Sequence, residues 1–295
     1  MVASRSVSGT VAALAFTSAL LSAAATVLLR VGFQRYGPYT ALWINMLVGT
    51  IGLWLAVAVT GGPGHPSFRS LAYFMLAGLV GTCVGRLLRF TSIERVGPSI
   101  SAALVNLNPL VSTGLAVLLL GEHVTLPLLV GTLVTIAGTT LLSLGGRAVG
   151  VRPGLLLLPL GSACCFGTVA VLRKMALDGA GVVVGAAANV SMAFVAFTMF
   201  LLISGQRDAM RCHGRSLLYF VGAGVAENLG VFLVLVALGF GAVSVVAPLT
   251  IISPIFVLLL SFFFLRGLEI LNKRLVMGSV LIVLGVYLII AFNRH

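Results

Sequence analysis

Long, continuous apolar segments separated by short polar connections dominate the chain. They predict helices at about 10–31, 39–60, 70–93, 99–120, 125–145, 153–177, 181–204, 216–239, 243–265 and 271–292. Each segment is close to the roughly 20 residues that a helix needs to cross a bilayer core. The runs do not alternate and are longer than barrel strands, which excludes a transmembrane barrel. We therefore predict an all-α integral membrane protein with ten transmembrane helices.

Composition and charge agree with this interpretation. The chain is 60% hydrophobic and only 8% charged, whereas soluble domains carry about 25% charged residues. The net charge is +12, but the basic residues stand singly or in pairs, mostly at the ends of apolar runs. Arginine and lysine in that position reach lipid headgroups. The pattern favours membrane lipid as a partner and argues against nucleic acid.

The first apolar run resembles a signal peptide, because Arg5 precedes it and a run of small residues follows at 22–25. However, the segment Val27–Arg30 has a counterpart in Ala170–Arg173, 143 residues later. A segment with a partner inside the chain is part of the fold. We therefore keep this run as the first transmembrane helix.

Further matches at a slowly drifting offset indicate an internal repeat. The matched pairs, 144 to 147 residues apart, are Asn45 with Asn189, Gly85 with Gly230, Pro109 with Pro254, Glu122 with Glu269, Gly131 with Gly278, and Gly138 with Gly285. We predict two tandem repeats, 1–147 and 148–295, with five helices each. Because five is odd, the second repeat enters the membrane from the opposite side. Inverted repeats of this kind place a substrate site near the midplane, between the two copies.

Motifs at the third to fifth helices recur in the same order in both halves. The first copy holds Arg95–Ser99, Asn108–Leu110, Leu120–Glu122, Gly131 and Gly138. The second copy holds Ser253–Phe256, Glu269, Gly278 and Gly285. It has Gly267-Leu268-Glu269 where the first copy has the Gly-Glu pair that ends at Glu122. These motifs resemble the EamA-type repeat of the drug/metabolite transporter superfamily. The resemblance covers nearly the whole chain and implies a ten-helix transporter, commonly an exporter of amino acids, other metabolites or drugs.

The charge distribution and the resemblance disagree about orientation. Twelve basic residues would lie on one side of the membrane and five on the other, which places both termini outside the cytoplasm. The resemblance implies both termini inside. We expect the orientation that the resemblance implies, because basic residues at the turn between the third and fourth helices, and near the glutamate after the fourth, are common in this repeat and weaken the charge count.

Two ionisable residues, Arg86 and Glu227, lie well inside predicted spans. Charged groups at that depth are costly and mark functional sites by default. If the two helices that carry them run antiparallel, the residues differ in depth by about four positions, or roughly 6 Å. Three roles stay open: a structural ion pair, binding of a charged or zwitterionic substrate in a wet cavity, and proton coupling through Glu227.

Amides and prolines within the spans are further candidates. Five asparagines need partners in hydrocarbon, either from other helices or from a cavity: Asn45, Asn106, Asn108, Asn189 and Asn228. Pro109 and Pro254 fall in matching mid-run positions, and Pro248 adds a second interruption. Paired interruptions in two repeats point to a transporter site or hinge, although packing kinks would look the same. Glu122 and Glu269 lie at helix ends, where we expect them to terminate helices or pair with loop arginines.

The sequence contains no pattern typical of catalysis or cofactor binding. The four cysteines have no metal or redox spacing, the four histidines lie in loops or at the terminus, and a Walker-type loop is missing. We therefore expect no cofactor, no metal and no enzymatic activity.

The leading prediction is a secondary active transporter that exports a small amino acid-like or drug-like metabolite, with protons as a candidate coupling ion. The alternatives are a lipid or lipid-linked metabolite flippase, and a non-transporting receptor or subunit. The preference for arginine over lysine, with abundant alanine, glycine, leucine and valine, is typical of a GC-rich bacterial genome. We predict a multi-pass protein of the cell membrane, which in a bacterium is the inner membrane. The pattern favours neither a monomer nor a homodimer.

Overall fold

The computed structural model describes residues 9–33, 36–62, 64–96, 101, 104–143, 153–250, 252–253, 255–256, 259–260 and 273–292. Every regular element within these ranges is helical. Pro254 and Glu269, both singled out from the sequence, lie outside the described residues.

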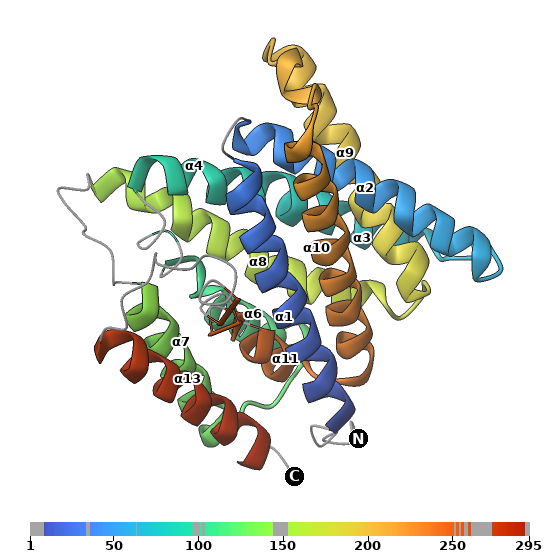
Figure 1. The fold of residues 1–295 in the computed structure, drawn as a ribbon. Helices are drawn as coiled ribbons and strands as arrows, with labels where there is room; N and C mark the ends of the chain where they lie inside the picture. Colours follow the sequence, from blue (N-terminus) through green and yellow to red (C-terminus); the bar gives the residue numbers. More distant parts are fainter. Residues whose placement is uncertain are drawn as a thin grey trace.

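The first half of the chain holds α1 (Gly9–Gly32), α2 (Pro38–Val59), α3 (Phe68–Ala77), η1 (Gly78–Gly85), α4 (Arg86–Val96), α6 (Asn108–Leu120) and α7 (Leu126–Ser143). The second half holds η2 (Pro153–Leu156), α8 (Leu157–Ala176), α9 (Val182–Ile203), η3 (Arg207–Met210), α10 (Arg215–Phe240), α11 (Val243–Thr250) and α13 (Lys273–Phe292). Figure 1 shows these helices as one bundle in which segments far apart in sequence lie side by side.

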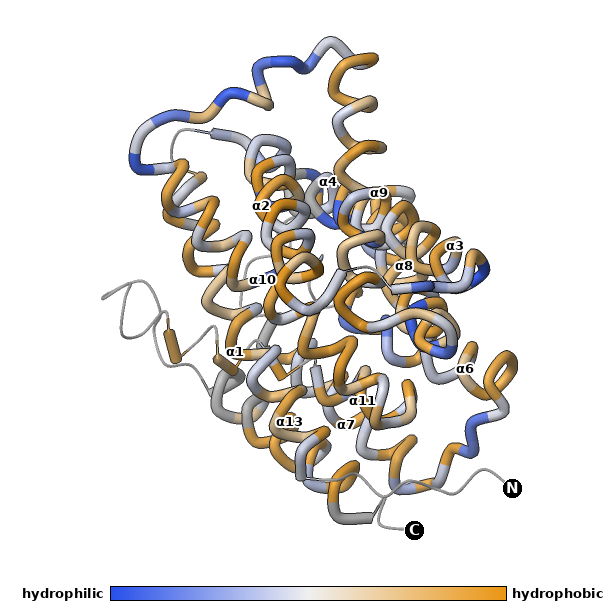
Figure 2. Tube along the Cα trace, turned by 90° about the vertical axis from the view of Figure 1, so that its right-hand side faces the viewer, coloured by the Kyte–Doolittle hydropathy of each residue, from blue (hydrophilic) through white to orange (hydrophobic). Residues whose placement is uncertain are grey.

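Six helical segments of the described chain are long and apolar enough to cross a membrane. They are Gly9–Leu29, Pro38–Val59, Phe68–Arg89, Gly154–Ala176, Val182–Ile203 and Arg215–Phe240. Shorter apolar helices cover Asn108–Leu120, Leu126–Leu141 and Val280–Ile290. Apolar residues dominate the helices in Figure 2, while hydrophilic ones gather in connections such as that between α9 and α10. The chain is therefore a multi-pass membrane protein.

The predicted helix at 70–93 is continuous but not uniform. It runs through α3, η1 and α4, and the eight residues of η1 are π-helical. This segment contains three glycines besides its small polar residues, and a Cβ on Gly78 would lie 2.0 Å from the carbonyl oxygen of Asn189. The wide turn therefore coincides with a close approach of α9. π-helical turns are rare and concentrate at functional sites, and Arg86 follows this one directly.

The predicted helix at 99–120 is wrong in one respect, because the described part is interrupted at residues 106 and 107, which form a turn. The cause is Pro109, which has no N–H for the carbonyl of Val105. The side-chain amide of Asn108 donates to that carbonyl oxygen instead, at 2.9 Å. α6 then starts at Asn108, with the proline in its first turn. Pro248, in contrast, lies inside α11.

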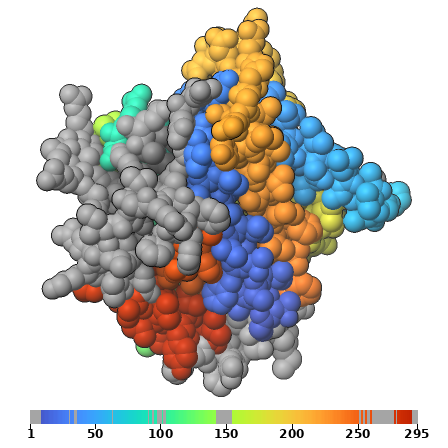
Figure 3. Space-filling view, viewed as in Figure 1, coloured from blue at the N-terminus to red at the C-terminus, as the bar shows by residue number. Residues whose placement is uncertain are grey.

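The helices of the two halves pair reciprocally. α1 packs along α10 in the way that α8 packs against α3 and η1, and α2 contacts α9 while α6 contacts α11. α1 and α10 are side by side on the face shown in Figure 3. Reciprocal pairing is the pattern that a two-fold axis produces, where one surface patch meets its own counterpart.

Two hydrogen bonds repeat this relation at atomic detail. The hydroxyl of Ser18 donates to the carbonyl oxygen of Gly230, and that of Ser162 donates to the carbonyl oxygen of Gly85, both at 2.9 Å. The serines are 144 residues apart and the glycines 145. Each bond therefore links one half to the other at equivalent positions.

Helices α7 and α13 form a further contact between the halves, visible as an adjacent pair in Figure 1. A Cβ on Gly131 would lie 2.8 Å from the carbonyl oxygen of Gly285, and one on Gly138 would lie 2.7 Å from that of Gly278. The lower-numbered glycine of α7 thus meets the higher-numbered glycine of α13, so the two helices run antiparallel. Small residues let the backbones approach this closely.

We expect Gly138→Ala to lower stability, because the added methyl group meets backbone atoms of α13 that cannot move without shifting the helix. Overpacking of this kind costs about 1–3 kcal/mol. The matched control is Gly52→Ala in α2, where a Cβ has no atom within 4 Å. Thermal unfolding in detergent should show a lower Tm for Gly138→Ala alone. Equal Tm values for the two variants would contradict the close glycine contact.

Candidate functional site

A polar cavity of about 250 Å³ lies between the two halves of the chain. The first half contributes residues of α1, η1, α4 and α6, and the second contributes residues of α8, α10 and α11. The polar and charged lining residues are Ser18, Ser22, Thr82, Arg86, Arg89, Asn108, Arg173, Glu227 and Thr250. The cavity therefore depends on both repeats for its walls.

Arg86 and Glu227 form an ion pair in the cavity wall. Arg86 Nη2 lies 2.9 Å from Glu227 Oε1, with the two side chains 11% and 22% exposed. Asn45 joins them, because its Nδ2 donates to Glu227 Oε2 at 3.1 Å and its Oδ1 accepts from Arg86 Nη1 at 2.9 Å. Both carboxylate oxygens thus have a donor, and the pair is fixed by a buried amide from a third helix.

Asn228 supports this arrangement from behind. Its Nδ2 donates to the backbone carbonyl oxygens of Asn45, at 3.1 Å, and Gly224, at 2.7 Å. A Cβ on Gly49 would lie 2.4 Å from Asn228 Oδ1, so only glycine leaves room for the amide. Asn228 itself is not among the cavity-lining residues. It fixes α2 against α10.

A second arginine, Arg173, is held by a similar amide. Its Nε and Nη2 donate to Asn189 Oδ1 at 3.1 and 3.0 Å. Asn189 Nδ2 in turn donates to the hydroxyl of Thr82 at 3.0 Å. Asn45 and Asn189 are both buried and occupy equivalent positions in the two repeats. Each one bridges an arginine and a residue of the third helix in the opposite half.

The two arrangements differ in charge. Thr82 lies 145 residues before Glu227, the offset that relates Gly85 to Gly230. One asparagine therefore bridges its arginine to a carboxylate, while the other bridges its arginine to a hydroxyl. Arg86 has a counter-charge, and Arg173 has none among its hydrogen-bond partners in the described chain.

The candidates from the sequence separate into three groups. Arg86, Glu227 and Asn108 line the cavity, whereas Asn45, Asn189 and Asn228 stand behind it as supports. Asn106, Pro109 and Pro248 are not among the described lining residues, and Asn106 lies in the turn before α6. Glu122 accepts from the N–H groups of Val243, at 2.8 Å, and Ser244, at 3.0 Å, so it caps the start of α11.

Sequence reasoning missed Thr82, Arg89 and Arg173 as site residues. A basic residue followed by another at a helix end, as in Arg173 and Lys174, is typical of a membrane boundary. Lys174 fits this pattern, because its Nζ donates to the carbonyl oxygens of Leu238 and Gly241 at the end of α10. Arg173 does not, because it donates to Asn189 inside the bundle. The repeat match between Arg30 and Arg173 was the available signal.

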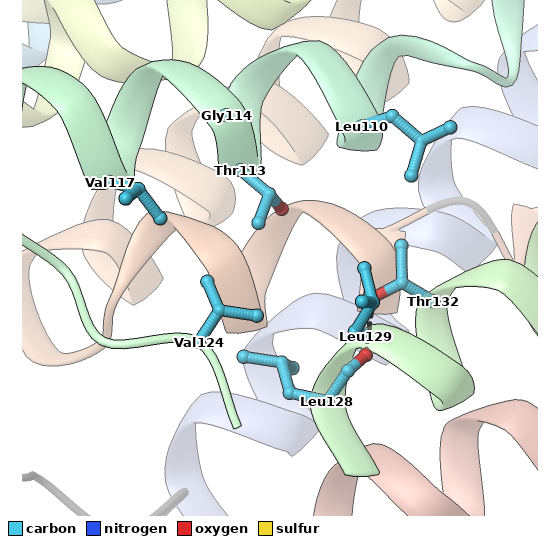
Figure 4. Close-up of a pocket in the computed structure, with 8 residues that line it drawn as sticks. All are labelled: Leu110, Thr113, Gly114, Val117, Val124, Leu128, Leu129 and Thr132. Atoms are coloured by element: carbon cyan, nitrogen blue, oxygen red, sulfur yellow. Dashed lines mark hydrogen bonds between the residues drawn. The ribbon is translucent and has the colours of Figure 1, made fainter. Parts of the chain in front are cut away.

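A separate apolar pocket of about 270 Å³ lies between α6 and α7. Figure 4 shows Leu110, Thr113 and Val117 of α6 across from Val124 and the α7 residues Leu128, Leu129 and Thr132. It shares no lining residue with the polar cavity. This apolar pocket is therefore separate from the charged cavity.

Two similarly built helical halves enclosing a charged cavity define a transporter-like class of multi-pass membrane protein. The model of the EamA-like transporter family matches residues 9–144 and 152–291. The chain therefore belongs to the EamA-like transporter family.

Solved structures agree on the fold. A crystal structure of another protein matches with a TM-score of 0.80 at 18% sequence identity, and the match covers 96% of this chain and 97% of that one. It is one of 29 matching chains. A comparison with curated proteins found no match. At this identity the structural likeness concerns the fold alone.

The ion pair in the cavity wall yields a test of coupling between the halves. We expect Arg86→Met and Glu227→Leu each to destabilise the protein by about 3 kcal/mol, because each leaves an opposite charge unpaired in a mostly buried site. The double variant should lose much less stability than the sum of the two single losses, since neither charge is then left without a partner. Unfolding in detergent measures all three. Strictly additive losses would show that there is no stabilising interaction between Arg86 and Glu227.

Proposed function

We propose that the protein is a secondary active transporter that exports a small metabolite by alternating access. The observation that carries this proposal is the charged cavity built from both repeats. A cavity shared by two packed units can open to one side or the other when the units rock against each other. Its volume, about 250 Å³, lies just below the usual range of ligand pockets, which starts at about 300 Å³. The cavity therefore fits a small metabolite.

We further propose ten transmembrane helices in two inverted repeats, 1–147 and 148–295, in a bacterial inner membrane. Reciprocal packing of the halves and the antiparallel pair of α7 and α13 support the inversion. The shorter helices α6, α7 and α13 supply three of the additional spans, and the helix predicted from the sequence at 243–265, of which α11 is the first part, supplies the fourth. Arginine-rich helix ends and the overall composition support the membrane assignment.

A lipid flippase is the transporter alternative. It needs a lateral opening that joins the polar cavity to an apolar surface, so that a headgroup and its tails can move together. The apolar pocket beside α6 and the polar cavity have no residue in common. This separation favours a soluble substrate over a lipid, and the charged lining favours transport over a receptor or subunit without transport.

The direct test is uptake by liposomes that contain the purified protein. A mixed pool of carboxylates, phosphate esters, neutral amino acids and amines is offered with and without a pH gradient, and the contents are analysed by mass spectrometry. Selective accumulation relative to empty liposomes is the expected result. If correctly folded and inserted protein accumulates no soluble compound, the transporter proposal is wrong.

For coupling, we propose that Glu227 exchanges its partner Arg86 for a proton when the cavity opens to the other side. Glu227 is the acidic residue among those lining the cavity. We expect Glu227→Gln to abolish accumulation driven by a pH gradient while exchange of substrate across the membrane continues. Flux assays in liposomes measure both rates. Loss of both activities, or of neither, would rule out the coupling role.

A further inference from the structure

We propose that the transported metabolite is a net anion without an ammonium group, and that Arg173 binds its carboxylate or phosphate. The proposal rests on the transport function above and names the class of substrate. It follows from the charge of the cavity, from which of its ions already have partners, and from the difference between the two repeats.

The cavity carries an excess of positive charge. Among the described residues, its lining includes the three arginines Arg86, Arg89 and Arg173 and the one carboxylate of Glu227, a formal charge of +2. In a partly buried site, unlike charges attract and like charges repel much more strongly than in water. An anion therefore gains free energy on entering, and a cation loses it.

Glu227, the acidic group among the described lining residues, is not available to a substrate amine. Glu227 uses Oε1 for Arg86 and Oε2 for Asn45. When it binds a proton, as proposed for coupling, its charge is gone. In neither condition does the described lining present a free carboxylate, so an ammonium group finds no counter-ion among those residues.

Arg173, in contrast, has unused donors. Asn189 Oδ1 accepts from Nε and Nη2, and in the described structure Nη1 makes no hydrogen bond or ion pair. The amide fixes one edge of the guanidinium group and leaves the other free. A planar, oriented guanidinium binds carboxylate or phosphate oxygens through paired hydrogen bonds.

The repeat explains why this arginine lacks a counter-charge. At the place where one half has Glu227, the other half has Thr82, bound to the same kind of asparagine. A carboxylate at 82 would complete a second ion pair and neutralise Arg173. With a threonine there, Arg173 has no carboxylate partner in the described chain, and its position fits an anion that comes from outside the protein.

Arg89 supplies a second cation one turn along α4 from Arg86. Its side chain is exposed and lines the cavity, and its guanidinium has no hydrogen bond or ion pair within the described chain. We expect it to attract the anion toward Arg173 by its charge.

Binding of defined probes to the purified protein in detergent tests the assignment. The probes are succinate, glycerol 3-phosphate, alanine and putrescine, each read by the shift in Tm over a concentration series. We expect succinate or glycerol 3-phosphate to raise Tm, and the better of the two identifies a carboxylate or a phosphate as the preferred group. Alanine and putrescine should leave Tm unchanged.

Two variants locate the site. Arg173→Gln should raise the apparent Kd for the anion at least about tenfold, because a charged hydrogen-bonded contact is lost. Thr82→Glu should also weaken anion binding, because its carboxylate occupies the site beside Arg173. Its Tm without ligand should be equal to or higher than that of the wild type. This second variant guards against loss of binding through misfolding. Arg69→Gln, an exposed arginine at the start of α3, is the control and should bind as wild type does.

The outcomes separate this inference from the transport function. An anion-dependent shift that is the same in Arg173→Gln, or a shift given only by alanine or putrescine, would overturn the anion site. Liposomes that accumulate only neutral or cationic compounds would keep the transporter and reject the anion. Anion binding that depends on Arg173, in protein that accumulates no compound in liposomes, would keep the site and reject transport.

Discussion

A guanidinium group in an apolar bundle must find oxygen acceptors, because leaving its donors unsatisfied away from water costs several kcal/mol. The arrangement at the centre of this protein follows from that requirement. Two buried asparagines, Asn45 on α2 and Asn189 on α9, each place an amide oxygen against an arginine. Their amide nitrogens then reach the opposite half. Each of these two amides therefore satisfies an arginine of its own half through its oxygen and bonds to the other half through its nitrogen.

Close approach of backbones makes these contacts possible. Gly49 leaves room for Asn228, and Gly78 lies against the carbonyl of Asn189. Without side chains at these points the helices come near enough for short amide groups to bridge them. The positions of these glycines therefore determine which polar groups on neighbouring helices can form hydrogen bonds.

Much of this was predictable from the sequence. Continuous apolar runs predicted the helices, and matches such as Gly85 with Gly230 predicted two related halves. Asn45, Asn189, Arg86 and Glu227 stood out because polar groups inside spans are costly. Arg173 could not be recognised, because a cation near a helix end normally reaches water, and only the three-dimensional packing shows that α9 supplies its acceptor. The turn before α6 depends on a side chain, Asn108, that replaces the missing donor of Pro109, and apolar periodicity carries no information about such a bond.

The pair of bonds from Ser18 to Gly230 and from Ser162 to Gly85 has a consequence for the energy landscape of the molecule. If the halves exchange conformations during transport, contacts related by the repeat simply trade places, and their contribution to the two end states is the same. The free-energy difference between those states then arises only at positions where the repeat is broken. Glu227 opposite Thr82 is one such position. Departures from symmetry at a few residues would therefore set the resting population of the carrier, while the symmetric majority keeps both states accessible.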